Sequence, residues 1–259
     1  MKLNIPSDGT KIGHDGEKLV VPNNPIIPYI IGDGIGIDVT PVMKRVLDYA
    51  VNKAYGNSRE IKWLELYAGS NSEDLYGSIL PEETIEAMKE YRISIKGPLT
   101  TPIGKGHKSI NVRIRQKLDL FACVRPIKYF PGTSTPMAES GLTDMVVFRE
   151  NTEDLYSGIE WEPNSPGAKR IIDFINKELG RSPFRFENNC GIGIKPVSEE
   201  GTKRLIRMAI DYSLAMNKSS ITIVHKGNIM KYTEGAFRDW AYDVVTNEYN
   251  GIIQKDNTY

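Results

Sequence analysis

The hydrophobic positions of the first hundred residues alternate between short apolar runs and longer stretches with helical spacing. Ile26–Ile31 and Ile61–Tyr67 are rich in β-branched and aromatic residues, which predicts two strands, and Ile93–Ile95 predicts a third. Between them, residues 41–54 and 81–91 place apolar side chains three and four apart, which predicts two helices. This order of elements indicates an α/β domain with parallel strands and right-handed crossovers.

Helix ends are marked by residues with known terminal preferences. Thr40 is expected to be the N-cap of the first helix, Pro41 suits its first position, and Gly56 is placed to end it. Ser198 is expected to cap a longer helix that runs to about Asn217, with an acidic first turn, as the helix dipole favours.

The second half of the chain combines short strands with amphipathic helices. Strands are predicted at Leu120–Val124 (buried), Met145–Glu150, Phe184–Phe186, Gly191–Lys195 and Ser219–His225. A helix is predicted over Gly167–Leu179, and residues 154–195 around it are expected to form a separate lobe. The last helix is predicted over Thr233–Tyr249.

Composition excludes several classes of protein. The 259 residues are 40% hydrophobic, and 33 basic side chains balance 33 acidic ones, which argues against bulk nucleic-acid binding. Cys123 and Cys190 are too few for a disulfide framework and lack metal-site spacing. Because no apolar run could span a bilayer or serve as a signal peptide, we expect a cytoplasmic protein without a membrane or nucleic-acid partner.

Charge is nevertheless unevenly placed. Residues 105–128 hold seven basic side chains and one acid, and residues 139–162 hold seven acids and one arginine, so the local balances are +6 and −6. The two segments could simply form two solvent-exposed surfaces of opposite charge. However, Asn111 and Arg115 share the face of a predicted helix that begins near Ser109, and a helix N-terminus with a nearby guanidinium suits an anion.

Two further arginines, Arg125 and Arg149, lie at the ends of predicted strands, and the ends of strands are where open α/β sheets bind ligands. Convergence of these arginines with Arg115 predicts a site for a small molecule with two or three carboxylates. The glycines of residues 32–36 lie between a strand and a helix but lack the dinucleotide spacing, since Ile37 takes the last glycine position. A tight turn and a phosphate cradle both remain open for them.

Taken together, these segments resemble the β-decarboxylating dehydrogenases, and within that family the bacterial-type NADP-dependent isocitrate dehydrogenases. The resemblance extends over nearly the whole chain, through the blocks NNPIIPYIIGDGIGIDVTP, IKGPLTTPIG, SINVRIRQKLDLFACVRP, DMVVFRENTEDLYSGIEW, CGIGIKPVSEEGTKRL and VHKGNIMKYTEGAF. Within the family, Ser109 and Asn111 match the isocitrate enzymes, whereas isopropylmalate enzymes carry leucines there.

The resemblance implies an isocitrate/isopropylmalate dehydrogenase-like α/β fold. Residues 1–120 would form the N-terminal part of a large α/β domain. Residues 121–153 and 199–259 would form an incomplete small α/β domain, and residues 154–198 a clasp-like insertion. The family's chain continues beyond Tyr259, so the sequence is expected to be an N-terminal fragment that lacks activity alone. The metal-binding aspartates are expected downstream of that residue.

The implied reaction is oxidative decarboxylation of isocitrate to 2-oxoglutarate, with NADP as oxidant and Mg²⁺ or Mn²⁺ as Lewis acid, as in the tricarboxylic acid cycle. NAD is the alternative oxidant, because the loop that recognises the 2′-phosphate is also expected downstream. By resemblance, the substrate's carboxylates are bound by Ser109, Asn111, Arg115, Arg125 and Arg149.

Two residues are implied in proton transfer. Tyr156 would protonate the enolate, and Lys226 would assist proton removal from the hydroxyl, reaching the partner's site in a homodimer, with Asn228 at the same edge. Thr100 would contact the cofactor, with Lys96 and Thr101 close by. Each also has a plain structural reading: Tyr156 as a half-buried lobe residue, Lys226 at a strand end, and Ser109 as an N-cap. His107 and His225 are expected to have no catalytic role.

Two alternatives remain for function. One is a sibling dehydrogenase acting on isopropylmalate or homoisocitrate, and the other is a non-catalytic subunit that binds polyanions. The charge layout also predicts that phosphate on Ser109 would block substrate binding by repulsion.

Overall fold

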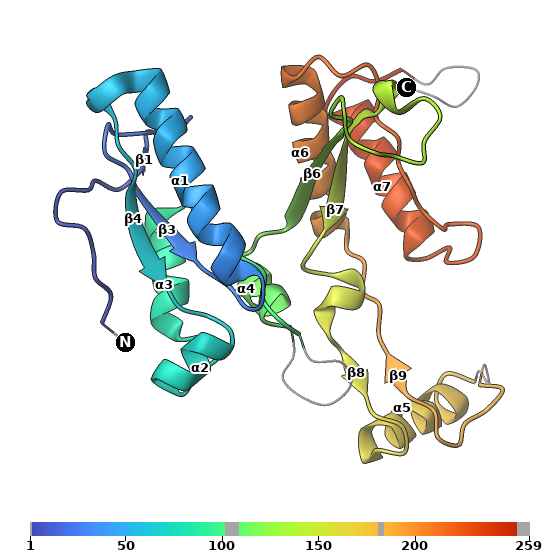
Figure 1. Cartoon of the computed structure of the whole chain (residues 1–259). Coiled ribbons are helices and arrows are strands. Elements are labelled where there is room, and N and C mark those ends of the chain that lie inside the picture. The colour runs from blue at the N-terminus through green and yellow to red at the C-terminus, as the bar shows by residue number, and fades with distance from the viewer. Residues whose placement is uncertain (1, 102–108, 181–183, 253–259) are drawn as a thin grey trace. The chain divides into compact units, whose positions relative to one another are not determined.

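The structure, a computed structural model, describes residues 2–101, 109–180 and 184–252. Contacts divide the chain into two compact units, Met1–Asp119 and Leu120–Tyr259 (Figure 1). Lys105, His107 and Lys108, which belong to the predicted basic segment and its loop, lie outside the described residues. In the described part of the chain, no helix is long and apolar enough to cross a membrane.

A parallel sheet forms the centre of the first unit, as predicted. Its strands β3 (Ile26–Ile30), β4 (Lys62–Leu66) and β5 (Ile95–Lys96) follow the order β4-β3-β5. Ile26 pairs with Lys62, and Tyr29 pairs with Ile95 on the other side. All five residues of β3 are buried, as expected of a central parallel strand. The third strand lies two residues later than its sequence indicated.

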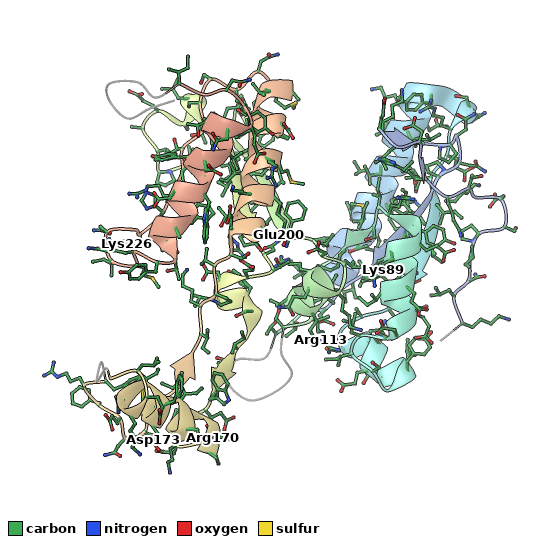
Figure 2. The ribbon with its side chains drawn as sticks, turned by 180° about the vertical axis from the view of Figure 1, so that it is seen from behind. Lys89, Arg113, Arg170, Asp173, Glu200 and Lys226 are labelled. Carbon is green, nitrogen blue, oxygen red and sulfur yellow. The ribbon has the colours of Figure 1, made fainter. Side chains whose placement is uncertain are left out.

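Helices α1 (Gly36–Tyr55) and α3 (Glu82–Tyr91) cover opposite faces of this sheet: α1 lies in front in Figure 1 and α3 in front in Figure 2. A short helix, α2 (Ser70–Tyr76), was not predicted. A small hairpin of β1 (Gly13–His14) and β2 (Leu19–Val20) precedes the sheet. The alternation of strands and helices therefore gives the predicted α/β layers.

The predicted start of α1 is wrong. The helix begins at Gly36, so Thr40 and Pro41 lie inside it instead of at its end. The Thr40 hydroxyl donates to the carbonyl of Ile31 at 2.8 Å, which gives this buried side chain a partner without a capping role. The predicted C-terminus is confirmed, because the Gly56 N–H bonds to Asn52 at a φ of 59°.

Helix α4 (Ile110–Lys117) is held to the first core by Ile110 and Ile114, which are both buried. Residues four apart share one helical face, so these two isoleucines fix the rotation of α4 about its axis. The next residue after each, Asn111 and Arg115, is therefore turned to the margin of the core, where both are half-buried. Apolar packing thus determines where the predicted substrate side chains lie.

The second unit is built on an antiparallel pair, β6 (Ala122–Lys128) and β7 (Asp144–Glu150), in which Cys123 lies opposite Arg149. Helices α6 (Glu199–Ala215) and α7 (Glu234–Asn247) pack together through a core that includes Ile206, Ile210, Ala241 and Val244. Two short 3₁₀ turns, η2 (Ser140–Leu142) and η3 (Asp154–Ser157), lie in this unit, and η1 (Gly56–Ser58) follows α1 in the first unit.

The N-cap of α6 is confirmed at Ser198, whose side chain accepts from the Gly201 N–H. Two predicted features of β6 are wrong, its position and its burial. The strand begins at Ala122, and most of it is exposed, because the described residues give this sheet only two strands.

Residues 154–198 contain α5 (Pro166–Lys177) between two short paired strands, β8 (Glu160–Trp161) and β9 (Ile192–Gly193). The predicted strand at Phe184–Phe186 does not form. That at Ser219–His225 does not form either, since no described strand pairs with it, and Val224 there is 85% exposed. The division into a small domain and a clasp-like insertion stays a prediction.

Candidate active site

The start of α4 leaves its serine hydroxyl available. Ser109 occupies the N-cap, but its side chain makes no capping hydrogen bond to the helix. The hydroxyl instead accepts from Thr101 Oγ1 at 3.2 Å. Asn111 donates to the carbonyl of Leu99 at 3.4 Å, which ties the helix start to the segment that carries Thr100. A hydroxyl, an amide and uncapped helical N–H groups are together suited to a carboxylate.

Lys96 adds a second cation next to Arg115. Its ammonium donates to the carbonyl of Gly97 at 2.6 Å. Burial lowers the pKa of Lys96 below its ordinary value, and the positive charge of the neighbouring Arg115 lowers it further. The negative charge of Asp33 raises the pKa of Lys96 and offsets part of this effect. A bound anion would relieve the repulsion between these two cations, as in a carboxylate site.

Asp33, for which the sequence suggested no specific role, organises the adjoining loop. Its carboxylate accepts from the N–H of Ser70 at 3.0 Å and of Thr100 at 2.8 Å, and its own N–H donates to Pro98 at 2.7 Å. At Gly32, where φ is +94°, an added Cβ would lie 2.3 Å from the Pro98 carbonyl oxygen. These contacts support the tight-turn interpretation of the glycines of residues 32–36.

We expect Asp33→Ala to lower the free energy of unfolding by about 2 kcal/mol, because two backbone N–H groups lose a charged acceptor. Urea unfolding of the protein measures this. Asp38→Ala, an exposed acid in the first turn of α1, is the control and should cost only a few tenths of a kcal/mol. Equal effects of the two substitutions would contradict a structural role for the Asp33 carboxylate.

In the second unit, Arg149 and Tyr156 come together. The guanidinium carbon of Arg149 lies 4.5 Å from the centroid of the Tyr156 ring, a cation–π arrangement. Arg149 Nε is buried and has no hydrogen-bond partner among the described residues. Because a buried donor without a partner is costly, this atom indicates a place for an anionic ligand.

A pocket of about 320 Å³ adjoins this pair, and its lining includes Arg149, Asp154, Tyr156, Lys195 and Glu234. Asp154 and Glu234 pair with Lys195, the latter at 2.8 Å. The lining of the pocket therefore combines a bridged ammonium and two carboxylates with a phenol and a guanidinium. Such a lining suits a small polar ligand.

Arg125 lies in the middle of β6 and is exposed, so the expectation that it follows the end of a buried strand is wrong. Its Nε donates to Cys123 Sγ at 3.0 Å. Because Cys123 lies opposite Arg149, the register places both arginines on one face of the β6–β7 pair, as diagonal neighbours. The Cys123 sulfur thus gives the Arg125 guanidinium a hydrogen-bond acceptor within the same strand.

Lys226 lies in the turn before α7, where Figure 2 labels it. Its side chain is exposed, and its backbone N–H donates to Glu234 Oε2 at 3.0 Å. The predicted residues therefore fall into two groups: Thr100, Ser109, Asn111 and Arg115 in the first unit, and Arg125, Arg149, Tyr156 and Lys226 in the second. Across the described residues, no three His, Cys, Asp or Glu side chains are grouped to hold a metal ion.

Comparison with known proteins assigns the chain to a family. The model of the isocitrate/isopropylmalate dehydrogenase family matches residues 26–258. The chain is 56% identical to "Isocitrate dehydrogenase [NADP] 1" of Colwellia maris over 254 residues, and 53% identical to the NADP isocitrate dehydrogenase of Pseudomonas aeruginosa over 255. Each match takes in 97% of this chain and 61% of the relative.

A solved isocitrate dehydrogenase from Methylococcus capsulatus superposes with a TM-score of 0.70 at 33% identity, over 88% of this chain and 58% of that one. The chain thus spans about three fifths of the length of these relatives. The predicted fold class is confirmed. The chain belongs to the isocitrate/isopropylmalate dehydrogenase family.

Proposed function

We propose that the whole protein oxidises and decarboxylates isocitrate to 2-oxoglutarate and CO₂, with NADP as the hydride acceptor. The observation that carries this proposal is the start of α4, where Ser109 and Asn111 present a hydroxyl and an amide beside Arg115. These groups suit the γ-carboxylate of isocitrate. An alkyl substituent, as in isopropylmalate, would leave them without partners.

Binding of the trianion is assigned to cationic side chains. Arg115, Arg125 and Arg149 would hold the remaining carboxylates, because bidentate guanidinium contacts offset their desolvation. The buried Nε of Arg149 supports this assignment, since a carboxylate would supply its missing acceptor. Lys96, beside Arg115, would add to the positive potential.

Proton transfer is assigned to two residues. Lys226, contributed by the partner subunit of a homodimer, would take the proton from the C2 hydroxyl as hydride leaves that carbon. The β-keto acid then loses CO₂, and Tyr156 would donate its phenolic proton to the enolate carbon. The half-buried position of Tyr156 over Arg149 supports its role, because the guanidinium would hold both ring and substrate.

Among the residues of this chain, only Thr100 is assigned to binding of the cofactor. Thr100 is exposed in the loop fixed by Asp33 and is assigned to the dinucleotide. The glycine turn is packed against Pro98 at Gly32 and against Ile31 at Gly36, and NADP receives here only its overall role as oxidant. The family implies a divalent metal, Mg²⁺ or Mn²⁺, but the described side chains do not fit a metal site, and no step is assigned to one.

We expect isocitrate to be preferred over isopropylmalate by about 10⁴-fold in kcat/KM, because a polar site rejects an alkyl analogue that leaves its groups unpaired. The assay uses the protein from its complete reading frame with Mg²⁺ and either NADP or NAD. Absence of turnover of isocitrate with both oxidants would refute the proposed function. A preference for isopropylmalate would instead identify a sibling dehydrogenase.

A further inference from the structure

Lys195, which the sequence did not single out, lines the same pocket as Tyr156. It follows β9, and its side chain is only 19% exposed. Its ammonium contacts two carboxylates, those of Asp154 and, at 2.8 Å, of Glu234. Asp154 and Glu234 are 80 positions apart in the sequence, so Lys195 joins two otherwise separate segments.

The first of these segments carries Tyr156. Asp154 begins the 3₁₀ turn η3, two residues before the tyrosine, and has a φ of +58°. Its N–H donates to the carbonyl of Pro196, the residue after Lys195, at 2.9 Å. A non-glycine residue in the left-handed region persists only when its surroundings hold it there. The Lys195–Pro196 segment thus holds the turn that places Tyr156 over Arg149.

The second segment carries Lys226. Glu234 is the first residue of α7, and while one carboxylate oxygen accepts from Lys195, the other accepts from the Lys226 N–H at 3.0 Å. This hydrogen bond joins the two ends of the loop of residues 226–234, and one of those ends is the backbone of Lys226, the proposed base. Lys195 is therefore connected through Asp154 to the turn that carries Tyr156, and through Glu234 to the backbone of Lys226.

The electrostatics of the three groups favour a fixed arrangement. Burial by itself lowers the pKa of Lys195, but the hydrogen bonds with Asp154 and Glu234 outweigh it, so the pKa is raised. The Lys195 ammonium and the Lys226 N–H hold the pKa of Glu234 below its ordinary value. Lys195 and Glu234 therefore stay charged near neutral pH, and loss of the ammonium would leave the carboxylates of Asp154 and Glu234 without their shared cation.

We infer that Lys195 is a positioning residue that links the turn of Tyr156 to the loop of Lys226. The inference rests on the proposed function. Because Lys226 is assigned to the partner's site, Lys195 would connect the proton donor of one active site with the base of the other. Its loss should disturb both proton transfers and leave the arginines that bind substrate in place.

The matched control is Lys203 on α6. Its ammonium also bridges two carboxylates, Glu199 at 2.7 Å and Asp243, and its side chain is 17% exposed. It does not belong to the lining of the pocket. Lys195→Met and Lys203→Met therefore each remove an ammonium that bridges two carboxylates. Only Lys195 lines the pocket of the proposed site.

In the protein from its complete reading frame, Lys195→Met should lower kcat about 10²-fold with KM for isocitrate changed by less than about threefold, since misplaced proton-transfer groups affect the chemical step. Lys203→Met should leave kcat unchanged, and Lys195→Arg should recover most of it. If Lys195→Met does not fold, Lys195→Gln is judged by the same criterion. A kcat of the Lys195 variant equal to that of Lys203→Met would overturn the inference.

A second readout does not depend on turnover. The ¹³Cζ resonance of Tyr156, assigned by its loss in Tyr156→Phe, should shift in Lys195→Met and stay in place in Lys203→Met. An unshifted resonance would also overturn the inference. An inactive wild-type protein would refute the proposed function alone, because the resonance still reports whether Lys195 positions the tyrosine.

Discussion

Ser109→Asp is expected to lower kcat/KM for isocitrate at least about 10³-fold, because a fixed negative charge would face the carboxylate that this position is proposed to bind. The helix should remain intact, since aspartate is as good an N-cap as serine. The Ser109 hydroxyl is not engaged in capping α4, so the exchange removes no existing capping bond. The effect would therefore come from binding and not from unfolding. Phosphate at the same oxygen would act in the same direction.

Steady-state kinetics and isothermal calorimetry with isocitrate measure this loss. Ser165→Asp is the matched control, because Ser165 is the N-cap of α5 and the exchange adds the same charge to a second helix start. Its kcat/KM should equal that of the wild type. Ser109→Ala, which removes the hydroxyl without adding charge, should have an intermediate effect. Normal isocitrate binding by Ser109→Asp would show that the start of α4 is not the carboxylate site.

Tyr156→Phe is expected to lower kcat by about 10² to 10⁴-fold, the usual contribution of a positioned general acid. Affinity for isocitrate should change little. Phenylalanine keeps the aromatic face over the Arg149 guanidinium, so the arginine should stay in place. The loss would therefore be confined to proton donation, which follows hydride transfer and decarboxylation in the proposed sequence.

Rapid mixing distinguishes these steps. The variant should form NADPH quickly in its first turnover and then slowly, whereas loss of the hydride step would remove the fast phase. Tyr212→Phe is the control, because Tyr212 packs edge-on against Phe148, with ring centroids 5.4 Å apart, and has no proposed chemistry. Near-wild-type kcat in Tyr156→Phe would assign the proton donor elsewhere.

Much of the first unit follows from local pattern. Apolar spacing and turn residues predicted the parallel strands, and the alternation of Ile110 and Ile114 with Asn111 and Arg115 already defines a buried and a polar face of α4. Such features depend on residues within one or two helical turns, where side-chain direction is set by the backbone period.

Two errors in the strand predictions have a common physical cause. Residues 219–225 have the composition of a strand, but a strand forms only with a hydrogen-bonded neighbour, and none of the described residues supplies one. β6 is apolar at its start, yet much of it is exposed in a two-stranded sheet. Strand propensity therefore indicated only the first part of β6, and it did not indicate what covers the strand.

The α/β class, the capped start of α6 and the polar face of α4 follow from the amino-acid sequence alone, because these arise from short-range periodicity and capping. The folded chain was needed to show that Asp33 joins Ser70 to Thr100, and that Lys195 joins Asp154 to Glu234. Contacts of this kind connect residues tens of positions apart and have no period along the chain, so they exist only once the packed core has brought their segments together.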